Sequence, residues 1–267
     1  MPTIAAFYRF APIADPQAVR DGLAPRLAAL GLTGTVILAT EGVNGTLAGP
    51  EAALEEALGA ISAVAGALRV NRSASGVEPF ARLKVQVRDE IVTMGDAAGS
   101  AAGGAGADPL QRVGRHVAPA EWNALIAAPD VAVIDTRNAY EVAIGTFAGA
   151  IDPGIATFRD FPAWWRQNAA RLAGRRIAMF CTGGIRCEKA TSLALAEGAA
   201  EVFHLEGGIL RYLAEVAPEE SLWRGECFVF DERVAVGPGG VPGRARPCPR
   251  CGQPVAAESP CACGGAG

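Results

Sequence analysis

The residues best suited to chemistry lie in one short segment, Cys181-Thr-Gly-Gly-Ile-Arg186. The apolar run before Cys181 predicts a strand, and the pattern after the two glycines predicts a helix over 187–197. In a loop between a strand and a helix, successive main-chain N–H groups converge on one point and add to the positive end of the helix dipole. A sulfur at that point is favoured as its anion, so we expect the pKa of the Cys181 thiol to fall well below about 8.5. Arg186 adds a fixed positive charge.

This arrangement suits a thiolate nucleophile, or a persulfide whose terminal sulfur needs stabilisation as an anion. The active-site loop between Cys181 and Arg186 has four members: Thr182, Gly183, Gly184 and Ile185. That ring is smaller than the one with which cysteine-dependent phosphatases encircle a phosphate, which favours sulfur as the bound atom. The alternative is a buried strand-end cysteine that packs as a small hydrophobe. The glycines, the arginine and the helix onset together favour a reactive thiol.

The three residues after the loop are open to interpretation. Cys187 could resolve an oxidised Cys181 as a disulfide, or it could pack inward from the first turn of the helix. Glu188 and Lys189 are expected to be charges on the helix surface, without a role.

Three further side chains could take part but have plainer interpretations. His204 is expected to be partly buried at the end of a strand, and a role as a catalytic base is the less favoured alternative. Trp164 and Trp165 could stack on an extruded base, although adjacent tryptophans more often pack in a core or at an interface.

The elements that would position the loop alternate along the second half of the chain. Short apolar runs, expected to be strands, cover 131–134, 177–180 and 201–204. Helical patterns cover 119–126, 162–173 and 187–197. Short buried strands that alternate with helices predict a parallel α/β sheet with chemistry at the carboxyl ends of its strands.

The first ninety-odd residues predict a separate, smaller domain. Strands are expected over 4–10, 34–40, 46–48 and 80–88, and helices over 16–30 and 51–64. The order βαββαβ is typical of a ferredoxin-like (acylphosphatase-like) α+β domain.

The last of these strands could present a basic face to RNA. The side-chain period of two puts Arg82, Lys84 and Arg88 on one side of the strand, together with Gln86. Arg69 and Arg72, which are near in sequence, could extend the same face. The commoner alternative is a solvated polar face of a half-buried sheet.

Two segments have little core-forming potential. Residues 95–108, GDAAGSAAGGAGAD, indicate a linker, so we divide the chain into domains at 1–94 and 117–236, a linker over 95–116, and a Gly/Pro-rich tail over 237–267. The tail carries four cysteines: Cys248, Cys251, Cys261 and Cys263. A C-x2-C pair is half of a tetrahedral zinc site, so a structural zinc is one interpretation and a metal-free tail is the other.

Composition bounds the classes of function. The chain has 267 residues, of which 50% are hydrophobic and 19% are charged, and this excludes a disordered or collagen-like protein. A formal net charge of −4 means that any nucleic-acid surface must be a local patch. The sequence contains neither a membrane-spanning run nor a signal peptide, so we expect no membrane partner, a cytoplasmic location and reduced cysteines. Neither a dinucleotide fingerprint nor a histidine–carboxylate triad is evident, so no nucleotide cofactor is expected.

The second half of the chain resembles a rhodanese domain. The segments VIDTRNAYEVAIGTFAGAIDP (133–153), CTGGIR (181–186) and HLEGGI (204–209) match that family's pattern in order. Asp135 and Arg137 fall at its strand-end D-x-R position, where they would brace the loop as an ion pair. Thr146 stands where many rhodaneses have histidine.

The chain as a whole is similar to the rhodanese-containing tRNA uridine hydroxylases. EGVNGTLAG (41–49), FRDFPAWW (158–165), CTGGIRCEKA (181–190) and WRGECFVFDERVAV (223–236) carry this resemblance. It implies an oxygen-dependent oxidoreductase that converts the wobble uridine (position 34) of tRNA to 5-hydroxyuridine, with Cys181 as the persulfide-forming catalytic residue beside Arg186.

The same resemblance implies the anticodon stem-loop of tRNA as the partner, and RNA specificity usually does depend on splayed single-stranded bases. Two alternatives stay open. One is a plain sulfurtransferase that moves persulfide sulfur to a thiol or RNA acceptor, and the other is a non-catalytic binding module.

Overall fold

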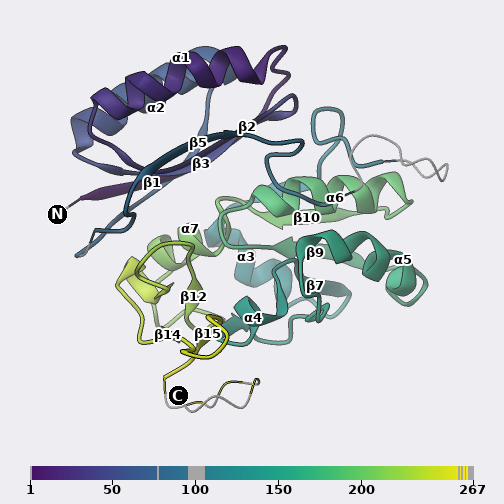
Figure 1. The fold of residues 1–267 in the computed structure, drawn as a ribbon. Helices are drawn as coiled ribbons and strands as arrows, with labels where there is room; N and C mark the ends of the chain where they lie inside the picture. Colours follow the sequence, from purple (N-terminus) through teal and green to yellow (C-terminus); the bar gives the residue numbers. More distant parts are fainter. Residues whose placement is uncertain are drawn as a thin grey trace. The chain divides into compact units, whose positions relative to one another are not determined.

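The computed structural model describes residues 2–76, 78–95, 106–257, 259, 261 and 263. The chain forms two compact units. One comprises Met1–Thr93 with Asp231–Arg233, and the other comprises Met94–Phe230 with Val234–Gly267. Figure 1 shows the order of elements within each unit.

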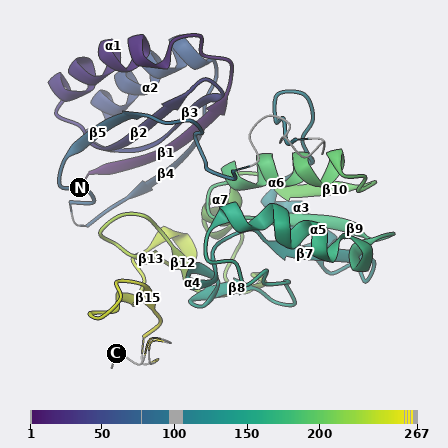
Figure 2. The same cartoon turned by 45° about the vertical axis from the view of Figure 1, so that its right-hand side comes forward.

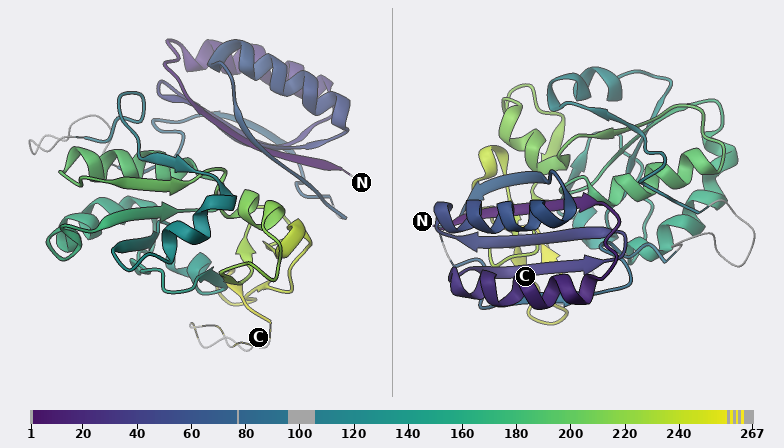
Figure 3. Two further views of the ribbon diagram at one scale, coloured as in Figure 1. Left: turned by 180° about the vertical axis from the view of Figure 1, so that it is seen from behind. Right: turned by 90° about the horizontal axis from the view of Figure 1, so that it is seen from above.

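The N-terminal unit is a five-stranded sheet with two helices on one face (Figures 1 and 3). Its elements are β1 (Thr3–Phe10), α1 (Pro16–Ala29), β2 (Thr33–Ala39), β3 (Gly42–Gly49), α2 (Glu51–Ala65), β4 (Arg69–Ala74) and β5 (Leu83–Val87). The strand order is β4-β1-β3-β2-β5. Alternate side chains of the central strands, such as Phe7, Val36 and Leu47, form the core with Leu27 and Leu54 from the helices. This confirms the predicted ferredoxin-like α+β fold.

The final strand of that fold is not the one expected from the sequence. The strand that completes βαββαβ is β4, which pairs antiparallel with β1, and the prediction missed it. β5 is a fifth strand, parallel to β2 at the opposite edge. The reason lies in the sequence of β4, RVNRSA, whose single large apolar residue, Val70, is exposed, so this edge strand has no hydrophobic periodicity to detect.

A short segment from later in the chain completes the N-terminal unit. Arg233 is 8% exposed and forms an ion pair with Asp231 at 2.7 Å. The same guanidinium donates to Ser73 Oγ at 3.0 Å, so it ties Asp231–Arg233 to β4.

The second unit is built on a four-stranded parallel sheet, visible in Figure 2. Its main elements are β6 (Arg115–Val117), α3 (Pro119–Ile126), β7 (Val131–Asp135), α4 (Ala139–Val142), β8 (Gly145–Phe147), η1 (Phe158–Asp160), α5 (Phe161–Leu172), β9 (Arg176–Phe180), α6 (Ile185–Ala196), β10 (Val202–Leu205) and α7 (Gly208–Glu215). The strand order is β6-β10-β9-β7. Helix α6 packs against β9 and β10 and also contacts α5, while α3 and α7 contact each other and pack against β7 and β10. The predicted rhodanese-like fold with a central parallel sheet is confirmed.

The core of this unit is strongly aromatic. Phe147 packs edge-on against Phe180, Tyr212 and Trp223, at centroid distances of 4.8, 4.7 and 5.2 Å. Trp122 closes the cluster at 6.0 Å from Phe147. Because Phe180 is the last residue of β9, this packing fixes the strand end that precedes Cys181.

The remaining chain forms small antiparallel pairs. They are β11 (Trp223–Gly225) with β8, β12 (Cys227–Phe228) with β13 (Ala235–Val236), and β14 (Arg246–Pro247) with β15 (Pro254–Val255); η2 covers Pro238–Gly240. Among the described residues no helix combines the length and the apolar character needed to cross a membrane.

Candidate active site

Cys181 lies where β9 ends, at the carboxyl edge of the parallel sheet. Its side chain is buried, and the main-chain N–H of Gly184 donates to its Sγ at 3.1 Å. Gly184 has φ 99°, a left-handed conformation that suits glycine and turns the chain directly into α6. The sequence prediction of a strand, a glycine-bearing loop and a helix is therefore confirmed, with the helix two residues longer at its start.

The surroundings of Cys181 favour its anion. Burial opposes ionisation, but the hydrogen bond from the Cys187 thiol, the charge of Arg186 and the N–H groups of Cys187 and Gly184 together lower the pKa of Cys181 to about 6. The pKa of Cys187 moves the other way, because burial and the neighbouring Cys181 sulfur both raise it. Cys181 is thus the thiolate of the pair and Cys187 the thiol that donates to it. The inward-packing interpretation of Cys187 fits its complete burial.

Arg186 acts on the sulfur through its charge, while its guanidinium is held by another residue. It forms a two-pronged ion pair with the buried Glu141, at 2.6 and 2.8 Å, and also donates to Thr182 Oγ1 at 3.3 Å. Burial raises the pKa of Glu141, but Arg186 and Arg137 outweigh it and keep that pKa below its usual range. Sequence reasoning missed Glu141. Its only local signal is the capping box with Asn138 at the start of α4.

Asp135 and Arg137 form the predicted ion pair, fully buried, with two hydrogen bonds of 2.9 and 2.7 Å. Arg137 also donates to the carbonyl oxygen of Gly145 at 2.6 Å, and Thr146 Oγ1 donates to Asp135 at 2.9 Å. Between them, Thr136 contacts the strand before the loop: its N–H and its hydroxyl both donate to the Phe180 carbonyl oxygen at 3.0 Å.

A second glycine-bearing turn, between β10 and α7, is hydrogen-bonded to the active-site loop. Ile209 and Leu210 donate their N–H groups to the carbonyl oxygens of Cys181 and Thr182, at 3.0 and 3.1 Å. Gly208 has φ +66°, and a Cβ at this position would stand 2.5 Å from both of those oxygens. Only glycine permits this close approach, which gives the LEGG segment a physical role that the sequence had not revealed.

The charged residues after the loop are buried, so the expectation that they lie on the helix surface was wrong. Glu188 is 5% exposed and Lys189 is 2% exposed. Both are on α6, which contacts β9, β10 and α5 and is buried from Arg186 to Leu195. His204 is more buried than expected, at 1% exposed, and it lies beside His116, with ring centroids 4.0 Å apart.

The tryptophans lie away from Cys181. Trp165 is buried on α5 and lines a cavity of 280 Å³ with residues at the start of β9, among them Arg176 and Ile177. Cys181 follows the opposite end of that strand. Trp164 packs against Phe161 at 5.7 Å. The packing interpretation therefore fits this pair better than base stacking.

The basic strand keeps its three cations on the surface. Lys84 of β5 is exposed, and so are Arg82 and Arg88, which flank the strand; Arg88 donates to Gln86 at 2.8 Å. Arg69 lies on the same face of the sheet as Lys84, although β4 places it at the opposite edge. The expected extension was wrong for Arg72, which lies on the face covered by the helices. Arg72 pairs there with Glu51 and Glu55 of α2.

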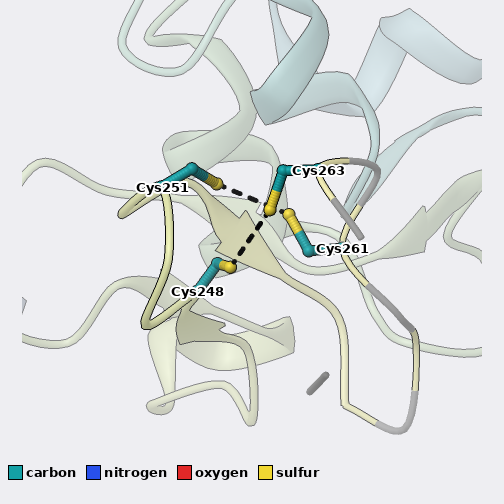
Figure 4. Close-up of side chains that lie close together, drawn as sticks. All are labelled: Cys248, Cys251, Cys261 and Cys263. Atoms are coloured by element: carbon teal, nitrogen blue, oxygen red, sulfur yellow. Dashed lines mark hydrogen bonds between the residues drawn. The ribbon is translucent and has the colours of Figure 1, made fainter. Parts of the chain in front are cut away.

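The four tail cysteines converge (Figure 4). Cys248 Sγ lies 3.6 Å from Cys263 Sγ, Cys251 Sγ lies 3.5 Å from Cys261 Sγ, and all four sulfurs are within 4.8 Å of one another. Four sulfurs at about 2.3 Å from a tetrahedral zinc ion are about 3.8 Å apart, so the donor set fits zinc. Cys227 does not belong to this cluster; it is buried, and burial raises its pKa to about 12.

Comparisons with known proteins agree with the two units. Residues 2–91 match the model of the UPF0176 acylphosphatase like domain, and residues 118–215 match that of the Rhodanese-like domain.

Similar proteins cover nearly the whole chain. A relative from Jannaschia sp. (strain CCS1) is 53% identical over 97% of this chain and 83% of its own length. Relatives from Mesorhizobium japonicum (52% identical; 96% and 81% covered) and Brucella ovis (51%; 95% and 81%) are similarly close. All three are named tRNA uridine(34) hydroxylase. This chain belongs to the tRNA uridine(34) hydroxylase family.

Proposed function

We infer that this protein hydroxylates the wobble uridine, position 34, of tRNA to 5-hydroxyuridine. The observation that carries this inference is the identity of 53% with a hydroxylase of that name over 97% of the chain. A plain sulfurtransferase is not favoured, because the similarity extends through both units and not through the rhodanese-like domain alone.

We propose Cys181 as the residue that carries the reaction, as a thiolate or as the persulfide formed on it. A pKa of about 6 leaves the sulfur ionised at neutral pH, and the Gly184 N–H is already aimed at it. Arg186 contributes its charge to the site. Glu141, Asp135 and Arg137 are then positioning residues, since each acts through the loop or through Arg186.

Molecular oxygen is the co-substrate in this proposal. Replacement of the C5 hydrogen of uracil by a hydroxyl group is a two-electron oxidation, and oxygen supplies the new atom. The second oxygen atom leaves as water, with two protons and with two electrons from an external reductant such as a thiol pair. Growth of cells under ¹⁸O₂ should place the heavy isotope in 5-hydroxyuridine, whereas label from H₂¹⁸O alone would contradict this part of the proposal.

The substrate element we propose is the anticodon stem-loop, where the target base is single-stranded and can be splayed toward a protein. The exposed Arg82, Lys84 and Arg88 would contact the phosphate backbone. The activity is then cytoplasmic, where tRNA is modified.

The tail is proposed to bind one structural zinc ion through Cys248, Cys251, Cys261 and Cys263. Four thiolates leave no open position on the metal, so the ion would stabilise the β14–β15 hairpin rather than take part in catalysis. Cys251→Ser should lower the zinc content of the purified protein by one equivalent, whereas Cys227→Ala, which removes a cysteine outside the cluster, should not. Equal zinc content in wild type, Cys251→Ser and Cys227→Ala would overturn the assignment.

Mass spectrometry of tRNA nucleosides tests the function itself. A strain that lacks the gene is complemented with wild type, with Cys181→Ser or with Cys227→Ala. We expect 5-hydroxyuridine to return with wild type and Cys227→Ala but not with Cys181→Ser. Cyanide-dependent thiocyanate production without a change in tRNA would indicate the sulfurtransferase, and full rescue by Cys181→Ser would indicate a binding module.

A further inference from the structure

The only two histidines of the chain lie side by side. β6 and β10 are neighbouring parallel strands whose register pairs His116 with His204. Side chains paired in this way leave the sheet on the same face. Their ring centroids are 4.0 Å apart, so four imidazole nitrogens lie within one small volume.

Helix α6 adds a carboxylate to this pair. Glu188 lies in the first turn of α6, and its Oε1 is 3.1 Å from His116 Nε2. One ligand atom from each of His116, Glu188 and His204 lies within 4.8 Å of the others. Glu188 and His204 are buried, while the His116 side chain is 24% exposed and leaves one side of the cluster open to solvent.

The chain before His116 is fastened to the same helix. Gly114 donates its N–H to Thr191 Oγ1 at 3.0 Å, and Asp108 donates its N–H to Ser192 Oγ at 2.9 Å. A Cβ on Gly114 would meet Thr191 at 2.9 Å, so the contact is close. His116 is therefore held against α6 by its backbone, independently of its own hydrogen bond to Glu188.

We propose that His116, Glu188 and His204 bind a divalent first-row transition metal ion. Two imidazole nitrogens and one carboxylate oxygen, with no thiolate, are a donor set that holds such ions and leaves coordination positions open. Ferrous iron is the member of the series whose open positions activate oxygen. The choice of iron rests on the proposed hydroxylation. The proposal that these three residues bind a metal ion rests on their geometry alone.

This triad could not be recognised in the sequence, because its three members come from three elements. His116 and Glu188 are 72 residues apart, and no spacing rule for ligands on a single helix or hairpin finds them. For this reason no histidine–carboxylate triad was evident from the sequence. The simpler alternative is that the histidine–glutamate hydrogen bond only braces α6 against the sheet.

Cobalt titration of the whole chain distinguishes a metal site from a hydrogen bond that only braces α6. The protein is stripped of metal with a chelator and titrated with Co²⁺ without oxygen, and bound cobalt is counted by elemental analysis. Cobalt on the tail cysteines gives intense thiolate-to-metal absorption, whereas cobalt on imidazole and carboxylate gives only weak ligand-field bands. We expect wild type to show the weak bands, and His116→Asn to bind one equivalent fewer while any thiolate absorption is unchanged.

The variants are chosen so that misfolding cannot be mistaken for loss of a ligand. His116 is partly exposed, so His116→Asn should fold, and circular dichroism checks this; Glu188→Gln tests the carboxylate. Glu197→Gln, a carboxylate at the end of the same helix that pairs with Arg166, is the matched control and should bind cobalt as wild type does. We expect affinity at the nitrogen–oxygen site to fall at least about tenfold in the two ligand variants and not in the control.

Two results would overturn the proposal: no weak-band cobalt in wild type, or the same cobalt stoichiometry and affinity in His116→Asn as in wild type. The titration needs neither tRNA nor turnover. A failure of the hydroxylation experiment above would therefore leave it unaffected, and the two proposals can fail separately.

Discussion

A buried thiol ordinarily stays protonated, and Cys181 departs from this because of the atoms around its sulfur. Two main-chain N–H groups, one neighbouring thiol and one guanidinium charge outweigh the cost of burial. The sequence could predict the direction of this effect, because the loop, its glycines and Arg186 are adjacent in the chain. It could not predict Glu141, which reaches Arg186 from 45 residues away through a tertiary contact.

The first prediction concerns the titration of Cys181. Alkylation of Cys181 by iodoacetamide, followed by peptide mass spectrometry, should show a midpoint near pH 6. Cys187→Ala removes the hydrogen bond from the neighbouring thiol and should move the midpoint upward, while Cys227→Ala should leave it in place. A midpoint near 8.5 in wild type would remove the proposed reactive group.

The same pKa predicts how stability depends on pH. The folded pKa of Cys181, about 6, is below its unfolded value, so its contribution is complete above the unfolded pKa and is lost as the pH falls through 6. The unfolding free energy of wild type minus that of Cys181→Ser should therefore rise between pH 6 and pH 8. Urea denaturation at several pH values measures this difference, and a flat difference would contradict the shift.

The Glu141–Arg186 pair gives a further prediction. Removal of one partner leaves the other charge buried and alone, so Glu141→Leu should cost about 3–5 kcal/mol of unfolding free energy. The double variant Glu141→Leu/Arg186→Met leaves no unpaired charge and should lose much less. Urea unfolding of both proteins tests this, and equal losses would mean that the ion pair is not what holds the two elements together.

At the scale of elements, the fold brings together what the sequence separates. Periodic patterns located most of the predicted strands and helices to within about two residues, because burial on one face leaves a clear signal. The exceptions are β3, which begins four residues before the predicted 46–48, and β5, which begins three residues after the predicted start at 80. They failed at the polar edge strand β4 and the three-residue strand β6, where burial leaves no periodic signal, and they also missed the amphipathic helix α7. The close contact at Gly208 escaped notice for a similar reason, since glycine has no side chain whose pattern could indicate its contact.

Gly208→Ala should show the importance of the turn between β10 and α7. A Cβ there would overlap the carbonyl oxygens of Cys181 and Thr182, so we expect a loss of stability and an upward shift of the Cys181 alkylation midpoint. Gly174→Ala is the matched control, because Gly174 also has positive φ (+78°) but faces open space. It should cost only the backbone strain, about 1–2 kcal/mol, and leave the midpoint unchanged.

At the scale of the whole molecule, an acidic chain must bind a polyanion through a local surface. The formal net charge is −4, and the proposed surface consists of the exposed cations on and beside β5: Arg82, Lys84 and Arg88. Sequence periodicity placed those side chains on one face but could not show that Arg69 and Arg72 lie at the other edge of the sheet.

Arg82→Ala should therefore weaken binding of an anticodon stem-loop and reduce the slope of log affinity against log salt by about 1. Arg26→Ala, which removes an exposed cation on the helical face of the same unit, should leave the slope unchanged. Filter binding at several salt concentrations measures both, and identical slopes for Arg82→Ala and wild type would reject this surface.

The N-terminal unit is assembled from two stretches of chain, because Arg233 is bound to β4 through Ser73. In a chimaera that took only residues 1–93 from a relative, Arg233 would come from this protein and β4 from the relative, so the contact with position 73 could be lost. The two stretches should thus be inherited and transplanted as one module, with compensating replacements at positions 73 and 233.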